Sequence, residues 1–201
     1  MTYSDMNDNP AHAAAVMLAA KGIVCHENIA GIYYFYPDKQ INRCDFTVML
    51  MMASGIEIDK SITSAGFADD NLIPAQHIPY IAAAKAAGIC DYRIVDGLTY
   101  FDPSEKVTRS QAAVMTVHAL GITNITQGLS LDVFSDASSI PEEARSAFAV
   151  LCEEGMMEAL PGGALAPNEA LTRAQTASLL YGAIEYAQET QTQSFWERLF
   201  G

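Results

Sequence analysis

The stretch VTRSQAAVM, residues 107–115, occurs again as LTRAQTASL at residues 171–179. In each copy a threonine precedes an arginine, and a glutamine follows three residues after the threonine, before an apolar run. This is the pattern of a capping box, in which the threonine caps a helix and the glutamine side chain hydrogen-bonds to the backbone N–H of the threonine. A third version is INRCDFTVML, residues 41–50, with Asn42 as the cap and Asp45 in place of glutamine. The sequence therefore predicts three helices that begin in the same way.

Each of these predicted helices carries an arginine at its first position, namely Arg43, Arg109 and Arg173. The positive end of the helix dipole disfavours a cation there by about 0.3–1 kcal/mol. A local rule that is broken three times in the same register marks a functional site or a fixed structural partner. An arginine beside the unpaired N–H groups of a helix N-terminus can grip an anionic ligand. It can equally pair with an internal carboxylate, such as Asp69 or Asp136, or with a carbonyl that ends a neighbouring helix.

The arginines lie 66 and then 64 residues apart, and other features recur in the same order around each of them. A proline lies six residues before each arginine, a turn glycine precedes each proline, and an aromatic-x-Asp element opens each unit. These features are Pro37, Pro103 and Pro167; Gly31, Gly97 and Gly163; and YSD at 3–5, FAD at 67–69 and FSD at 134–136. The chain is therefore predicted to contain three copies of one unit, at residues 1–58, 59–124 and 125–187, followed by a tail at 188–201.

Within a unit the pattern indicates a first helix, a Gly/Pro loop and a second helix opened by the capping box. The second helices are apolar nearly all round, which predicts burial at the centre of the molecule. A unit of roughly 65 residues buries too little surface to be stable alone, whereas the whole chain can build a shared core. We therefore expect an all-α fold, a pseudo-threefold bundle of helix–loop–helix units that form one folded body with one central helix per unit.

The composition excludes several classes of function. A formal net charge of −13 argues against nucleic acid as a partner. No apolar run reaches the roughly 18 residues of a membrane span, and no signal peptide precedes the first unit. The four cysteines form no CxxC motif and are predicted to be free thiols. The histidines lack metal-ligand spacing, so we expect no metal and no cofactor. No nucleophile–base pattern appears, so we expect no catalytic residue. We also expect the chain to be a monomer.

Two stretches carry a resemblance to a known family, DGLTYFDPSEKVTRSQAAVM at residues 96–115 and GGALAPNEALTRAQTASLL at residues 162–180. Over residues 3–187 the chain resembles the S-layer homology (SLH) family, whose repeat opens with F-x-D, passes a Gly-ended helix and a G-x-F-x-P loop, and closes with a T-R-A-E helix start. The resemblance implies three SLH repeats in a non-catalytic, extracellular module that holds a larger exported protein to the bacterial cell wall. It further implies binding of a secondary cell-wall polysaccharide, often pyruvylated, in grooves between repeats.

The resemblance also assigns candidate glycan-binding residues. The T-R-A-E arginine maps onto Arg43, Arg109 and Arg173, and the F-x-D aspartate onto Asp5, Asp69 and Asp136. The tryptophan that many members carry in the first helix is missing, because the sole tryptophan, Trp196, lies in the tail. Loop tyrosines can supply the aromatic surface of a sugar groove, among Tyr33, Tyr34, Tyr92 and Tyr100, of which Tyr92 and Tyr100 are assigned to the site.

Departures from the family pattern leave a second function open. The first unit has Asn42 in place of the threonine, and the glutamate of T-R-A-E is replaced in all three units. The first unit could therefore have kept the fold and lost the site. The alternative function is a protein–protein interaction or assembly module on the same bundle, with degenerate glycan grooves.

Overall fold

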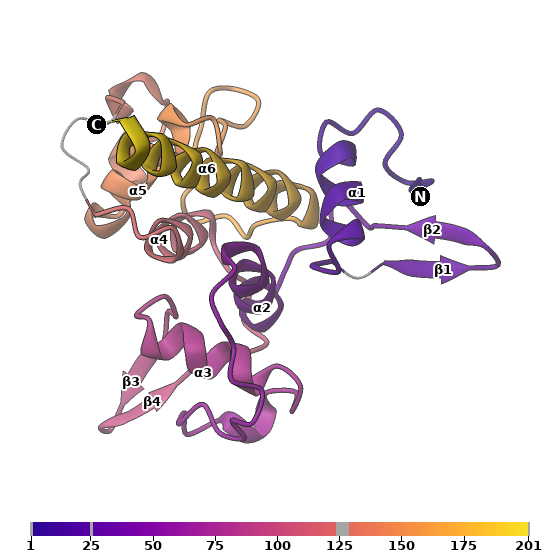
Figure 1. Ribbon diagram of the computed structural model, residues 1–201, viewed down its shortest axis with the longest axis vertical. Coiled ribbons are helices and arrows are strands. Elements are labelled where there is room, and N and C mark those ends of the chain that lie inside the picture. The colour runs from indigo at the N-terminus through magenta and orange to yellow at the C-terminus, as the bar shows by residue number, and fades with distance from the viewer. Residues whose placement is uncertain (1, 25, 124–128, 201) are drawn as a thin grey trace.

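The computed structural model describes residues 2–24, 26–123 and 129–200, with side chains up to residue 190. The elements are α1 (His12–Ala20), β1 (Glu27–Ile29), β2 (Ile32–Tyr34), α2 (Arg43–Ser54), α3 (Ile78–Ala86), β3 (Arg93–Val95), β4 (Leu98–Tyr100), α4 (Arg109–Ala119), α5 (Glu142–Glu153) and α6 (Arg173–Phe200), with short 3₁₀ turns at Asp70–Leu72, Leu131–Val133 and Ala137–Ser139. Helices α2, α4 and α6 meet near the middle of the molecule, and the two β-hairpins extend outward at its edge (Figure 1).

The predicted helix starts are confirmed for α2, α4 and α6. In α4 the Thr108 hydroxyl accepts a hydrogen bond from the backbone N–H of Gln111 at 3.2 Å, and the Gln111 side chain accepts one from the backbone N–H of Thr108 at 2.9 Å. The start of α6 repeats both contacts. The start of α2 is a simpler cap, in which the Asn42 side chain accepts from the backbone N–H of Asp45 at 2.7 Å. The spacing of the capping residues thus fixed the helix boundaries.

The segments just before these three helices are joined in a closed ring of backbone hydrogen bonds. The N–H of Ile41 donates to the carbonyl of Leu171 at 3.0 Å, that of Leu171 to Val107 at 2.9 Å, and that of Val107 back to Ile41 at 3.3 Å. All three side chains are buried. Because each expected unit supplies one member, the ring connects the first unit directly to the third.

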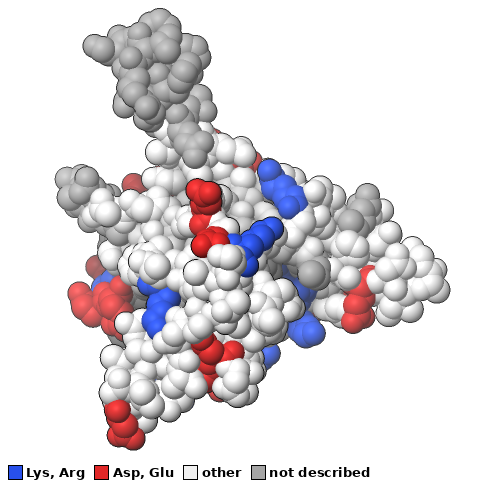
Figure 2. Space-filling model, turned by 60° about the horizontal axis from the view of Figure 1, so that its bottom comes forward, with Lys and Arg blue, Asp and Glu red and all other residues white. Residues whose placement is uncertain are grey.

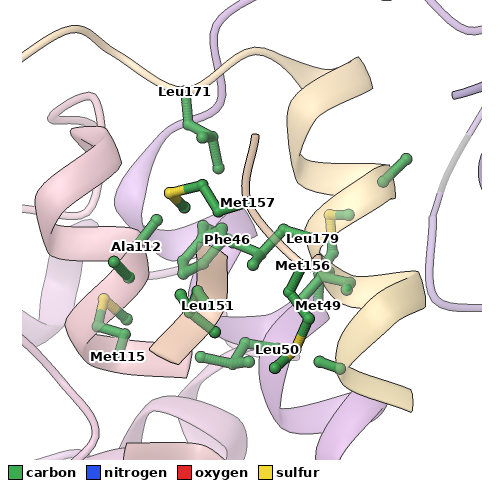
Figure 3. Packing of buried hydrophobic residues seen from close by; sticks show 14 of the residues in the cluster. Phe46, Met49, Leu50, Ala112, Met115, Leu151, Met156, Met157, Leu171 and Leu179 are labelled. Carbon is green, nitrogen blue, oxygen red and sulfur yellow. The ribbon is translucent and has the colours of Figure 1, made fainter. Parts of the chain in front are cut away.

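A shared hydrophobic core surrounds this ring. Its main cluster of buried residues reaches from Tyr3 to Ile184. Figure 3 shows side chains of α2, α4, α5 and α6 that meet in it, including Phe46, Leu50, Met115, Leu151 and Leu179. A smaller cluster around Phe67, Ile81 and Phe101 joins α2 and α3 to the loop that follows β4. Burial of apolar surface from all three expected units is the main favourable contribution to folding.

The expectation of an all-α fold is wrong, because two antiparallel β-hairpins stand between the helices. Strand β1 pairs with β2, and β3 pairs with β4. The two-residue turns are Ala30–Gly31 and Asp96–Gly97, and all four residues have positive φ, between 50° and 86°. This conformation suits the twist of a two-residue hairpin. In the third expected unit a single bridge, Leu160 to Ala164, takes the place of the hairpin.

Other expectations can be compared with the described residues. Helix α6 continues without a break through residue 188, where the tail was expected to begin. The expected boundary between residues 124 and 125 lies outside the described residues, as does Cys25. Cys44, Cys90 and Cys152 are free thiols, as predicted. Within the described residues, no helix combines the length and the hydropathy that a membrane crossing requires.

Candidate functional site

The three aspartates of the aromatic-x-Asp elements bind backbone N–H groups of their own unit. The carboxylate of Asp69 accepts hydrogen bonds from the N–H groups of Phe101 at 2.9 Å and Asp102 at 2.8 Å. Asp5 and Asp136 make the same pair of contacts with the corresponding loops. The second residue of each pair is not glycine, yet its φ lies between 50° and 58°. Since L-residues rarely adopt this conformation, each carboxylate stabilises a strained loop.

The three arginines bind the same loop residues from a neighbouring unit. Each guanidinium donates to the backbone carbonyl of the residue whose N–H an aspartate holds. The contacts are Arg43 Nη1 to Phe101, Arg109 Nε to Leu165 at 2.6 Å, and Arg173 Nε to Phe35 at 2.7 Å. One peptide segment per unit is therefore held by an aspartate on its N–H side and by an arginine on its C=O side. The sequence left three kinds of partner open for the arginines: an anionic ligand, an internal carboxylate or a carbonyl at a helix end. The described contacts are with carbonyls, which belong to loops rather than to helix ends.

The N-termini of α2, α4 and α6 do not offer the unpaired N–H groups that an anion site at a helix start requires. In α6 the N–H of Arg173 donates to Lys39 O and that of Ala174 to Pro37 O, both at 2.9 Å. The third N–H is bound by the cap, Thr172. Helices α2 and α4 use the equivalent carbonyls of the neighbouring units. An anion at these helices would therefore have to bind the arginine side chain rather than the backbone.

The arginines differ in how their charge is compensated. Arg43 is 8 % exposed and lies 3.9 Å from the carboxylate of Asp102, although its Nε finds no hydrogen-bond partner among the described residues. Arg109 is 3 % exposed, and its Nη2 donates to the carbonyl of Glu158 at 2.8 Å. No carboxylate of the described residues lies within 4 Å of Arg109, and burial lowers the pKa of this guanidinium. Arg173 is half-buried, 4.6 Å from the ring centroid of Phe35.

A cleft of about 490 Å³ opens between α6, the loop after α5 and the start of α1. Arg109 forms part of its wall, beside Gln175 and the exposed Ser178 of α6. Asp38 and Glu158 also line it. The described hydrogen bonds of the Arg109 guanidinium are to backbone carbonyls, and no described carboxylate lies within 4 Å of this buried charge, so its burial is unfavourable.

A second cleft, of about 330 Å³, occupies the equivalent position on α4, between the loop after α3 and the start of α5. Gln111 and Val114 stand there where Gln175 and Ser178 stand on α6, 64 residues later. Its charged lining differs, since Asp91 and Glu143 are present and no described lysine or arginine is. The two clefts thus share a position in the unit and each has two acidic lining residues, but only the α6 cleft also has an arginine in its wall.

The third equivalent position, on α2, is occupied by side chains of the first two units. The thiol of Cys44 lies 3.4 Å from Nδ1 of His77, the residue directly before α3. Cys44 is the counterpart of Ser110 and Ala174 in the two clefts. The structure therefore brings the first unit into direct contact with the second at this point.

The predicted tyrosines lie on the hairpin β3–β4 rather than in either cleft. Tyr92 is 43 % exposed, with its ring centroid 5.9 Å from that of Phe67. Tyr100 is half-buried, and the guanidinium of Arg93 lies 5.2 Å from its ring centroid. Neither tyrosine is among the described residues that line the α4 or the α6 cleft. The structure thus does not bring them together with Arg109.

The residues that the sequence analysis missed are those held between an aspartate and an arginine, Phe35, Phe101 and Leu165. Each lies two residues before the repeated proline, so the register was visible in the sequence. Their backbone groups make the contacts, however, and their side chains share only apolar character. The wall residues of the clefts were also missed, because the clefts form between units that are distant in the chain.

Comparisons with known proteins address the family. The family model of the S-layer homology domain matches residues 133–177. An amylopullulanase of Thermoanaerobacterium thermosulfurigenes is 29 % identical over 188 residues, which are 92 % of this chain and 10 % of that protein. Exoglucanase XynX of Acetivibrio thermocellus is 27 % identical over 187 residues, which are 92 % of this chain and 16 % of that protein. The chain thus spans less than a fifth of the length of either relative, and its residues 133–177 match the S-layer homology domain family.

Proposed function

We propose that this chain is a non-catalytic module that anchors a larger protein to the bacterial cell wall by binding an anionic wall polysaccharide in the cleft on α6. The match of residues 133–177 to the S-layer homology domain supports the anchoring role. The observation that carries the proposal is the guanidinium of Arg109, which lines the cleft and has no carboxylate partner among the described residues. A secondary cell-wall polysaccharide with carboxylate groups, such as pyruvyl ketals, supplies the missing negative charge.

The surroundings of Arg109 favour a short-range interaction with a carboxylate. Of its five N–H donors, the contacts with Leu165 and Glu158 use one on Nε and one on Nη2. A carboxylate that reaches the guanidinium from the cleft interacts with it more strongly than with an exposed cation, because the nearby protein lowers the effective dielectric constant. Specificity then depends on position rather than on overall attraction. The face seen in Figure 2 carries both signs of charge side by side, and the chain as a whole is acidic.

The other candidate residues are not assigned to ligand binding in this proposal. Arg43, Arg173 and the three aspartates hold the loops through backbone contacts, so we assign them as positioning residues. The cleft on α4 has no lysine or arginine among its described lining residues, so it offers no comparable cation to an anionic polymer. We therefore propose one working groove, between the third expected unit and the first. Tyr92 and Tyr100 lie outside it and contribute no contact in this proposal.

The names of the relatives support a surface-anchored parent protein. An amylopullulanase and an exoglucanase are enzymes, and this chain matches only 10 % and 16 % of their respective lengths. In the proposal, the matched part retains such an enzyme at the wall while the remainder of the protein carries the activity. The proposed location of the chain is therefore the bacterial cell surface.

The test is sedimentation of the purified chain with cell-wall sacculi that carry or lack their attached polysaccharide. We compare wild type with Ser178→Glu, which adds an anion to the exposed wall of the cleft without touching the backbone contacts of Arg109. Ser178→Ala is the neutral control at the same position. His118→Glu makes the same change of charge in the cleft on α4, where His118 is also exposed.

Wild type, Ser178→Ala and His118→Glu should sediment only with sacculi that carry the polysaccharide, and Ser178→Glu should bind at least about tenfold more weakly, since two like charges at close range cost more than 1.4 kcal/mol in a shielded site. Equal binding of Ser178→Glu would exclude the α6 cleft. If wild type fails to bind any wall material, the anchoring proposal is wrong. The assembly module would then be the better reading, in agreement with the arginines being tied to backbone carbonyls.

A further inference from the structure

The hairpin β1–β2 presents one face that is apolar and aromatic. Its register pairs Glu27 with Tyr34 and Ile29 with Ile32, so these four side chains share a face. Tyr36 continues this face two residues after Tyr34, and its hydroxyl donates to the carboxylate of Glu27. Ile29, Ile32 and Tyr36 are 52 %, 48 % and 38 % exposed. We call Ile29, Ile32, Tyr34 and Tyr36 the hairpin strip.

The hairpin strip faces away from the body of the protein. Tyr33 points to the opposite face of the hairpin, where it packs against the main core and its ring centroid lies 5.0 Å from that of His26. The hairpin itself extends outward at the edge of the molecule (Figure 1). The strip is therefore an accessible surface on an element whose other face is anchored.

The two tyrosine rings of the strip are held in a fixed arrangement. Their centroids lie 6.1 Å apart, and their planes differ by 21°. The backbone N–H of Tyr36 is bound by Asp5 at 2.7 Å, and its hydroxyl is bound by Glu27. Tyrosine offers a large contact area with few rotatable bonds, so a preorganised pair loses little entropy when it binds a ligand.

The second hairpin shows that the fold does not require this arrangement. The counterparts of Glu27 and Tyr36, 66 residues later, are Arg93 and Asp102, which form an ion pair across the same two strands. The guanidinium of Arg93 also lies over the ring of Tyr100, the counterpart of Tyr34. The cross-strand contact is thus made with different chemistry, and only the first hairpin leaves two tyrosines side by side.

We propose that the hairpin strip binds an extended, neutral polysaccharide chain. The flat C–H faces of pyranose rings pack on tyrosine and isoleucine side chains, while sugar hydroxyls can hydrogen-bond to the Tyr36 hydroxyl and to Glu27. Four side chains are too few for a stable protein interface, which buries roughly 800 Å² and about 20–30 residues on each side. The carboxylate of Glu27 on this face disfavours an anionic polymer at the strip. This site goes beyond the anchoring cleft, because its ligand is neutral and none of its residues lines that cleft.

The test is native affinity electrophoresis in gels that contain hydroxyethylcellulose, a soluble neutral β-linked chain, beside gels with carboxymethylcellulose, its anionic counterpart. The loss variants are Tyr34→Ala and the double substitution Glu27→Arg with Tyr36→Asp, which gives the first hairpin the ion pair of the second. Tyr100→Ala is the matched control. The reverse double substitution, Arg93→Glu with Asp102→Tyr, builds a second strip.

Wild type and Tyr100→Ala should be retarded by hydroxyethylcellulose and less by carboxymethylcellulose. Both loss variants should bind at least about tenfold more weakly, and the reverse variant more tightly than wild type. The proposal is overturned if wild type migrates as in a plain gel, or if the double substitution, with an unchanged circular dichroism spectrum, keeps full retardation. Sedimentation with polysaccharide-bearing sacculi separates the two sites, since the loss variants should still sediment if the α6 cleft holds the wall polymer.

Discussion

At the scale of single residues, one peptide group explains why an arginine stands at each helix start. Phe101 is held through its N–H by Asp69 and through its C=O by Arg43 from the preceding unit. A hydrogen bond with a charged partner contributes about 1.5–3 kcal/mol, more than the few tenths that the helix dipole costs. The unfavourable interaction of each arginine with the helix dipole is therefore compensated by a hydrogen bond between units. Arg109 makes the same kind of contact with Leu165, and no carboxylate of the described residues lies within 4 Å of its guanidinium, which is the basis of the proposed anion site.

Tyr3 departs from the rule that a buried polar group has a hydrogen-bond partner. Tyr3 is fully buried, its hydroxyl has no hydrogen-bond partner among the described residues, and burial raises its pKa. The equivalent positions are Phe67 and Phe134, which lack the hydroxyl. We predict that Tyr3→Phe increases the free energy of unfolding by about 1 kcal/mol, because the cost of burying an unpaired polar group disappears. Urea denaturation followed by circular dichroism measures this.

The control for this prediction is the opposite change, Phe67→Tyr. Phe67 is 5 % exposed, so its new hydroxyl should lower the free energy of unfolding by about 1–2 kcal/mol. A Tyr3→Phe protein that is less stable than wild type would show that the Tyr3 hydroxyl has a partner, for example a buried water.

At the scale of elements, the sequence predicted the helices better than the strands. A helix start depends on side chains three residues apart, such as Thr108 and Gln111, so a short stretch contains the whole signal. The strands are only three residues long and show too little alternation to be recognised. The stretch RIVDGLTY does contain a hairpin signal, since Asp96–Gly97 stands between β-branched and aromatic residues, but the repeat alone identifies only the turn glycine Gly97.

The candidate site, like the fold, was only partly predictable from the sequence. The repeated positions of the arginines and aspartates were evident from spacing. Their partners were not, because Arg173 and Phe35 are 138 residues apart and meet through a backbone carbonyl. A sequence pattern records which side chains recur, whereas the geometry that places one unit against another depends on the packed core. The clefts on α4 and α6 follow from that packing.

The turn of the first hairpin allows a prediction at this scale. Ala30 has a φ of 51°, where an L-residue other than asparagine or aspartate is strained, and Asp96 occupies the equivalent place with a φ of 50°. Ala30→Asn should therefore stabilise the hairpin by roughly 0.5–1 kcal/mol. Hydrogen exchange of the Ile29 and Ile32 amides, followed by NMR, should slow by a factor of about 2–5.

The matched change in the second hairpin is Asp96→Ala, which should speed the exchange of the Val95 and Leu98 amides by a similar factor. Both substitutions leave the helices unaffected, so the amides of α4 serve as an internal reference. Unchanged exchange in the Ala30→Asn protein would mean that the turn does not limit the opening of the hairpin.

At the scale of the whole molecule, the backbone ring makes the three expected units depend on one another. The backbone N–H of Ile41, of Val107 and of Leu171 donates to one of the other two units, and the C=O of the same residue accepts from the remaining unit. The loop contacts of the arginines link the same pairs of units in the opposite donor direction, since the third unit donates to the first through Arg173. If one unit opens, both of its neighbours lose hydrogen bonds and buried surface. We therefore expect the described body to unfold in one cooperative step.

Three free thiols report on this cooperativity, because Cys44, Cys90 and Cys152 belong to different expected units. Burial raises the pKa of Cys44 to about 12, that of Cys90 to about 12 and that of Cys152 to about 11, from an ordinary 9.0, so the folded thiols hold little reactive thiolate at pH 8. Pulsed alkylation along a urea gradient, resolved by peptide mass spectrometry, should give three coincident midpoints that also match circular dichroism. Ile41→Ala, which removes buried contacts at the ring, should lower all three midpoints together, by the equivalent of about 2–5 kcal/mol. Earlier labelling of one thiol would show that its unit opens alone, and the ring would then not couple the three units.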